Sequence, residues 1–145
     1  MEDAKITAYH IGFVLGPCIN ASGRLDTAAR SLALLNAKTK EEAARLAGDL
    51  TALNQSRKAL TEKGKEEAIR IIETTELKND RVLVVYLPDC HESLAGIIAG
   101  RIREKYHRPA FVLTGGETSA KGSGRSIESY SMYEELVKCA DLMIQ

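Results

Sequence analysis

Apolar residues recur at helical spacing through the first half of the chain, up to about residue 77. Residues 26–36 and 39–74 are predicted as helices, with Asp26 capping the first and a Thr39–Glu42 capping box opening the second. The second helix carries an apolar stripe of Leu46, Leu50, Leu53, Leu60, Ala68, Ile71 and Ile72. Gly64 interrupts it and predicts a bend or break. A helix of roughly 30 residues spans about 45 Å, which suggests a connector between two domains.

The second half alternates strand-like and helical patterns. The β-branched run at 81–87 predicts a strand buried on both faces, followed by a helix at 93–106 and a strand at 110–113. This order predicts a parallel pair with a right-handed crossover. Gly115-Gly116 then turns the chain so that 121–125 returns as a third strand, and Ser131 caps a last helix. The fold class is therefore α/β: a long connector helix, then a small domain with a mostly parallel sheet flanked by helices.

Composition adds little except locally. Lys+Arg and Asp+Glu are equal at 20 each, but His91–Ser126 holds more basic than acidic residues, which suits an anionic ligand. Three widely spaced cysteines indicate free thiols in a reducing cytoplasm. The polar N-terminus lacks a signal pattern and no apolar run is long enough for a membrane span, so a cytoplasmic protein without a membrane partner is expected. The helical pattern after Met132 runs to the last residue, which suggests a truncated C-terminus.

The segment Ala120–Ser126 is the strongest candidate for a ligand site. Its two glycines would let a backbone approach closely, and its hydroxyls and cations suit a phosphate. The same residues are also typical of a flexible turn, and neither a Walker loop nor a dinucleotide fingerprint is present. His91 follows the first predicted strand at a helix N-terminus, where anions collect. A helix-capping histidine is the alternative, and residue chemistry alone favours it.

Catalytic and metal-binding patterns are missing from the sequence. Its three histidines are isolated, and there is no Asp-x-Asp or Asp-His-His group and no nucleophile–base signature. We therefore expect no catalytic residue in this chain and no metal bound by it.

Four segments in order resemble the RecJ single-stranded-DNA exonucleases, of the DHH phosphoesterase family. Ile11–Leu25 contains G-P-C-I-N-A-S-G-R-L, similar to the G-P-R-I-N-A-A-G-R-L of that family. His91–Arg101 looks like its H-P-G-V-I-G-I-V-A-S-R segment, and Tyr106–Pro109 and Lys121–Ser126 follow at the family's spacing. The resemblance covers nearly the whole chain.

The resemblance implies three regions: 1–38 at the end of the catalytic-domain side, a connector helix at 39–77, and a truncated DHHA1-type nucleic-acid-binding domain at 78–145. In such enzymes an upstream DHH domain, absent here, holds manganese or magnesium. The intact protein would be a 5′-to-3′ exonuclease of DNA repair and recombination, with single-stranded DNA as its partner, and this piece alone would be inactive.

The resemblance also implies roles for particular residues. Asn20 and Arg24 would lie near the catalytic cleft, and His91 would take a ligand-side role. The DNA backbone would be held by the last segment, namely Lys121, Gly122, Ser123, Gly124, Arg125 and Ser126.

Two departures from the family pattern affect these expectations. Cys18 stands where many relatives carry arginine, and Glu92-Ser93 replaces Pro-Gly after the histidine. Two alternative functions stay open: a non-catalytic nucleic-acid-binding module, and a DHH-family phosphodiesterase acting on short oligonucleotides or cyclic dinucleotides.

Overall fold

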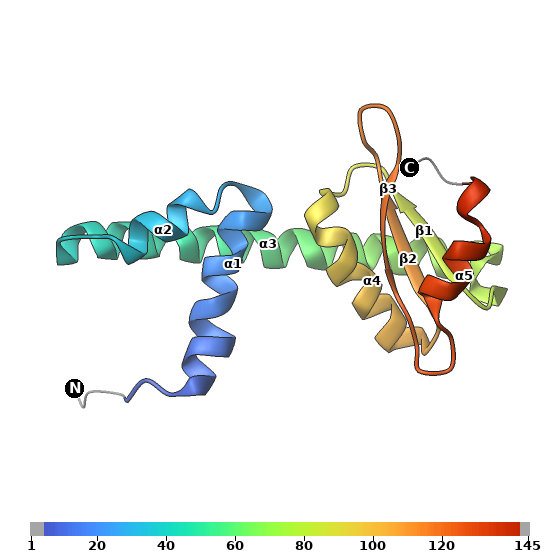
Figure 1. Cartoon of the computed structure of the whole chain (residues 1–145), viewed down its shortest axis with the longest axis horizontal. Helices are drawn as coiled ribbons and strands as arrows, with labels where there is room; N and C mark the ends of the chain where they lie inside the picture. The colour runs from blue at the N-terminus through green and yellow to red at the C-terminus, as the bar shows by residue number, and fades with distance from the viewer. Residues whose placement is uncertain (1–4, 143–145) are drawn as a thin grey trace. The chain divides into compact units, whose positions relative to one another are not determined.

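The computed structural model describes residues 5–142 (Figure 1). The chain divides into two compact units, residues 1–59 and 60–145, and the boundary falls inside the long helix α3 (Lys40–Thr74). The first unit is helical, and the second combines helices with a small sheet. This confirms the predicted α/β class with a long helix. The domain limits expected at 38/39 and 77/78 stay predictions.

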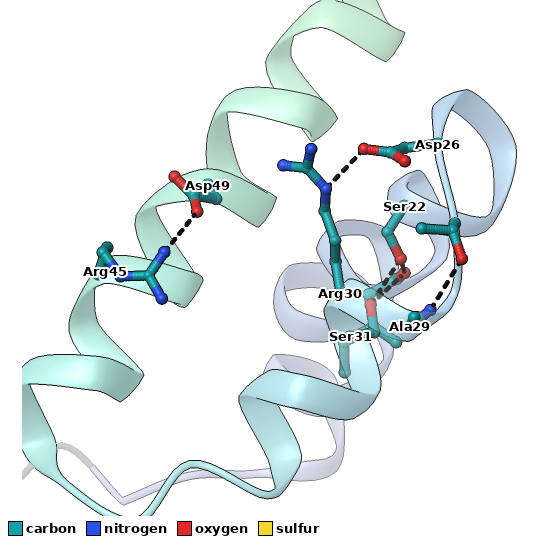
Figure 2. A network of polar contacts seen from close by, with 9 residues as sticks. Ser22, Asp26, Ala29, Arg30, Ser31, Arg45 and Asp49 are labelled. Atoms are coloured by element: carbon teal, nitrogen blue, oxygen red, sulfur yellow. Dashed lines mark hydrogen bonds and ion pairs between the residues drawn. The ribbon is translucent and has the colours of Figure 1, made fainter.

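In the first unit, two buried serines connect consecutive helices. A π-helical segment, η1 (His10–Leu15), continues into α1 (Gly16–Leu25), and α2 (Ala29–Leu35) follows after a short turn. The Ser22 and Ser31 hydroxyls lie within hydrogen-bonding distance of each other at 2.7 Å (Figure 2). Their oxygens also lie 3.0 and 2.9 Å from the carbonyl oxygen of Ile19. Because buried polar groups need partners, this network fixes α1 against α2.

The predicted cap at Asp26 is wrong. The α2 helix begins at Ala29, whose amide donates to Thr27 Oγ1 at 3.2 Å. Asp26 instead forms an ion pair with Arg30 at 2.5 Å (Figure 2). An i,i+4 pair of this kind supports the helix start by charge, without satisfying an amide.

The α3 helix is continuous through Gly64, so no break occurs there. Thr39 caps it as predicted, accepting from the Glu42 amide at 3.2 Å, while the Glu42 carboxylate accepts from the amide of Lys38. A Cβ on Gly64 would lie 2.5 Å from Ile98 Cδ1 of α4 (Glu92–Tyr106). Gly64 therefore permits close packing between the C-terminal part of α3 and α4.

The second unit contains a three-stranded sheet in the order β1-β2-β3 (Figure 1). β1 (Leu83–Leu87) pairs in parallel with β2 (Ala110–Thr114), which pairs antiparallel with β3 (Lys121–Arg125). The parallel pair joined by a helix and the returning third strand are confirmed. Since each strand pairing has a different sense, the sheet is mixed.

The two faces of the sheet are covered differently. Helix α4 packs against β2 and β3 and buries Leu94, Ile98 and Ile102. The short helix α5 (Met132–Lys138), capped by Ser131 as predicted, lies on the opposite side (Figure 1). On that side Val84 and Tyr86 of β1 are 44% and 52% exposed. The expectation that this strand is buried on both faces is therefore wrong: Met132 of α5 lies against Gly124 of β3, at the opposite edge of the sheet from β1.

Two short 3-10 segments complete the described chain, η2 (Glu76–Asn79) before β1 and η3 (Ala140–Leu142) after α5. The predicted helical pattern at the end of the chain is thus divided, and its last residues, 143–145, lie outside the described residues.

Candidate nucleic-acid interface

Alternate residues of β3 project from opposite faces of the sheet, as strand geometry requires. Lys121, Ser123 and Arg125 lie on the face toward α4, since Lys121 contacts Glu92 of α4 and the other two lie against Gly96. Gly122 and Gly124 lie on the other face, toward Leu113 and Met132. The β3 strand therefore has one polar face and one packing face.

Arg125 folds back along its own strand. Its Nη1 donates to the Gly124 carbonyl at 2.7 Å and to Ser123 Oγ at 3.3 Å. The residue is exposed, and within residues 5–142 both of its hydrogen bonds come from Nη1. A guanidinium has five N–H donors, so Arg125 retains donors for an incoming oxygen.

Lys121 forms an ion pair across the gap between β3 and α4. Its Nζ lies 2.6 Å from Glu92 Oε2, and the ammonium lowers the pKa of the Glu92 carboxyl below its usual value. A shallow cavity of about 290 Å³ adjoins this pair, lined by Glu92, Ser93, Ala95, Thr114, Lys121 and Gly122. Because a carboxylate of the chain already neutralises Lys121, a phosphate entering here would compete with Glu92.

His91 caps α4. Its Nδ1 accepts from the Ser93 amide at 3.3 Å and lies 2.8 Å from the Ser93 hydroxyl. A side chain that satisfies an orphan amide in this way stabilises the helix start. The capping alternative is therefore present in the structure, and a ligand-side role for His91 stays a prediction.

Ser126 also makes a helix-starting contact, because its Oγ accepts from the Met132 amide at 3.1 Å. This bond ties the end of β3 to α5, on the packing side of the sheet. The Ser126 hydroxyl therefore stabilises the start of α5. Its contact with DNA stays a prediction.

The glycines of β3 have a packing reason. A Cβ on Gly124 would overlap Met132 Sδ and would lie 2.7 Å from a ring carbon of Phe111. A Cβ on Gly122 would lie 2.5 Å from Leu113 Cδ2. Close approach of a ligand was the predicted reason for these glycines, but the space that they leave is filled by the protein's own side chains.

Most of the local excess of basic residues is engaged elsewhere. Arg108 donates to the carbonyls of Lys78 and Asp80 at 2.7 and 3.0 Å. Arg101 and Arg103 both pair with Glu104. Lys121 and Arg125 are the basic residues of β3, and both lie on its face toward α4.

Asn20 and Arg24 belong to the first unit. They lie one turn apart on α1, and both are exposed, whereas Ala21 and Ser22 between them are buried. Residues at i and i+4 share a helix face, so the two polar side chains emerge together. The thiol of half-buried Cys18 accepts a contact from Asn54 Nδ2 at 3.4 Å.

Metal ligands are not clustered in residues 5–142: no group of three or more His, Cys, Asp or Glu side chains is placed to hold an ion. The three cysteines are free thiols. No helix among the described residues is long and apolar enough to cross a membrane.

Proteins similar to this chain are known from both sequence and structure. No family model matches it. The single-stranded-DNA-specific exonuclease RecJ of Escherichia coli K12 is 40% identical over 136 residues, which cover 91% of this chain and 24% of that protein. The corresponding enzyme of Bacillus subtilis 168 is 34% identical, over 92% of this chain and 17% of that protein. The crystal structure of Thermus thermophilus RecJ with Mg²⁺ aligns with this chain at a TM-score of 0.81 and 31% identity. The aligned residues cover 96% of this chain and 21% of the RecJ chain.

The chain matches a segment of the RecJ exonucleases. It spans roughly a quarter or less of the length of the curated RecJ proteins named above, with shares of 24% and 17%. The resemblance drawn from the four sequence segments is thereby confirmed, as is the fold class. A second RecJ structure, bound to manganese, matches with a TM-score of 0.78.

Two residues of the candidate interface were missed by sequence reasoning. Glu92 was noted as a departure from the family pattern, although its pairing with Lys121 depends on a contact 29 positions away along the chain. Gly96 was included in the His91–Arg101 resemblance but was given no role, because a glycine within a helical pattern gives no local sign of what lies opposite it. Only the register of β3 against β2 brings Ser123 and Arg125 to that helix.

Proposed function

We propose that this chain holds the sugar-phosphate backbone of single-stranded DNA for a metal-dependent RecJ exonuclease that acts from the 5′ end in DNA repair and recombination. The observation that carries the proposal is the polar face of β3, where Ser123 and Arg125 stand together on the side toward α4. A guanidinium beside a hydroxyl suits phosphate oxygens, which accept charge-assisted hydrogen bonds.

The hydrolytic step is assigned to another part of the intact protein. RecJ structures are known with Mg²⁺ and with manganese, and such ions would activate water for phosphodiester hydrolysis. The residues described here do not fit a metal centre. The missing upstream DHH domain is therefore the proposed place of the metals, and the chain alone is expected to be inactive.

The grip is proposed to be on the backbone and not on the bases. Single-strand binders that favour stacking use aromatic side chains, and this chain has two Phe, five Tyr and no Trp. Asn20 and Arg24, on one face of α1, are proposed to lie near the scissile phosphate in the intact enzyme. Binding should consequently depend on salt and little on sequence.

Fluorescence anisotropy of the full chain with a labelled single-stranded oligonucleotide, titrated at several salt concentrations, tests the proposal. Arg125→Ala should weaken binding for all sequences alike and reduce the slope of log K against log salt by about one. Lys138→Ala is the matched control, because it removes one cation from α5 on the opposite side of the sheet. If Arg125→Ala leaves the slope unchanged, or if the control lowers it equally, the proposed backbone contact is wrong.

A further inference from the structure

Gly96 of α4 lies directly opposite the polar face of β3. An ideal Cβ built on this glycine would lie 2.7 Å from Arg125 Nη2 and 2.8 Å from Ser123 Oγ. Both distances are shorter than a carbon atom can approach these groups. The guanidinium and the hydroxyl therefore occupy space that the Cβ of any other residue would fill.

The backbone gives no reason for a glycine at this position. Among the described residues no glycine has a positive φ, so residue 96 does not need glycine's conformational freedom. A glycine within a helix is also less favourable than alanine. What remains is the space itself, which the two polar side chains of β3 use.

The Arg125 atom nearest to Gly96 carries donors that the chain's own bonds leave unused. Arg125 Nη1 is occupied by the Ser123 hydroxyl and the Gly124 carbonyl. Nη2 lies over Gly96, and in the part of the chain that the structure describes it donates no hydrogen bond. A side chain at position 96 would thus displace the part of the guanidinium that is free to bind an oxygen.

We propose that Gly96 is a positioning residue, which lets Arg125 and Ser123 lie against α4 so that both face one phosphate of a bound strand. The phosphate in this statement rests on the proposed function, whereas the positioning of the two side chains does not. Gly96 acts through Ser123 and Arg125 and touches no substrate itself.

The test compares Gly96→Ala with Gly100→Ala in the full 145-residue chain. Gly100 lies one turn further along α4, and a Cβ there would meet nothing within 4 Å. Both variants make the same change in the same helix, so both should keep or raise Tm. Only Gly96→Ala should weaken binding of a labelled oligodeoxythymidylate, by about tenfold for the loss of a charge-assisted hydrogen bond.

A second readout measures position without DNA. The NMR resonance of the Arg125 Nε–Hε group should shift in Gly96→Ala and stay in place in Gly100→Ala. An unshifted resonance in Gly96→Ala, or equal losses of binding in both variants, would overturn the inference. If Gly96→Ala folds poorly, the double variant Gly96→Ala/Ser123→Ala is compared with Ser123→Ala alone, so that the loss of the Ser123 hydroxyl is the same in both proteins.

The two proposals can fail separately. The proposed DNA contact of this chain is wrong if Arg125→Ala leaves DNA affinity unchanged, or if the unmodified chain binds no oligonucleotide at low salt. The Arg125 resonance then still decides whether Gly96 positions that side chain. If Arg125→Ala weakens binding and Gly96→Ala does not, the DNA contact stands and the role of Gly96 is rejected.

Discussion

Alternate residues of β3 serve different purposes, and the difference arises from strand geometry alone. The odd-numbered residues carry a cation, a hydroxyl and a guanidinium toward α4, whereas the glycines give room to Leu113, Phe111 and Met132. The predicted strand at 121–125 is present, and not the flexible turn that was its alternative, and its glycines are packing positions. The chemistry predicted for the segment therefore resides in half of its residues.

Glu92 should act as a competitor of DNA at Lys121. Its carboxylate lies 2.6 Å from Lys121 Nζ, and the hydrogen bond to that ammonium lowers the pKa of the Glu92 carboxyl. A glutamate is charged at neutral pH even without such a shift. Glu92→Gln should therefore tighten single-strand binding and steepen its salt dependence by about one counterion. The measurement is the same anisotropy titration at several salt concentrations.

Glu135→Gln is the control for this prediction. Glu135 forms a similar exposed pair with Lys138 on α5, so the change in net charge is identical and the location differs. Equal tightening in the two variants would mean that only overall charge matters, and weaker binding by Glu92→Gln would contradict the competition directly.

Gly124→Ala should destabilise the fold. The new Cβ would overlap Met132 Sδ and would lie 2.7 Å from Phe111, and overpacking of this kind costs about 1–3 kcal/mol in the free energy of unfolding. Urea denaturation measures the loss, with Gly100→Ala as the unhindered reference. Unchanged stability together with weakened DNA binding would instead favour the interpretation that a ligand approaches Gly124.

At the scale of elements, α3 and α4 are joined by a titratable contact. The Tyr106 hydroxyl donates to Glu73 Oε1 at 2.6 Å, and desolvation together with this bond raises the pKa of Tyr106 to about 12. An unfolded tyrosine titrates near pH 10. The contact therefore contributes stability that is complete below about pH 10 and is lost as pH rises toward 12.

The difference in unfolding free energy between the unmodified chain and Tyr106→Phe should accordingly shrink as pH rises from about 10 to 12. Urea unfolding at a series of alkaline pH values measures it, and the comparison removes the contribution of the lysines, which titrate in both proteins. A difference that stays constant across this range would show that Tyr106 is not held protonated by its contact with Glu73.

Elements with a strong local pattern were predictable, and those fixed by distant contacts were not. The α3 helix, its Thr39 cap, the parallel pair and the Ser131 cap follow from periodicity and capping residues within a few positions. The exposed side of β1 depends on where α5 lies, and the continuity of α3 at Gly64 coincides with its packing against Ile98. Such features arise from tertiary packing, which no short window of sequence contains.

At the scale of the whole molecule, the chain matches one segment of RecJ proteins and has a helical unit and an α/β unit, whose boundary falls inside the helix α3. The match to RecJ was predictable because four motifs occur in order along nearly the entire chain. The arrangement of the candidate site was not, since Glu92, Gly96 and β3 meet only through the register of the sheet. We propose that the intact enzyme adds its metal centre to this grip.

The most direct test of the DNA-binding face is an amide NMR titration of the chain with a short oligodeoxythymidylate at low salt. The expected result is a set of amide shifts concentrated in Lys121–Arg125 and in the first turns of α4, around Glu92 and Gly96, with the α5 resonances unaffected. Shifts concentrated on α5 and the exposed side of β1, or no shifts in the second unit, would contradict it.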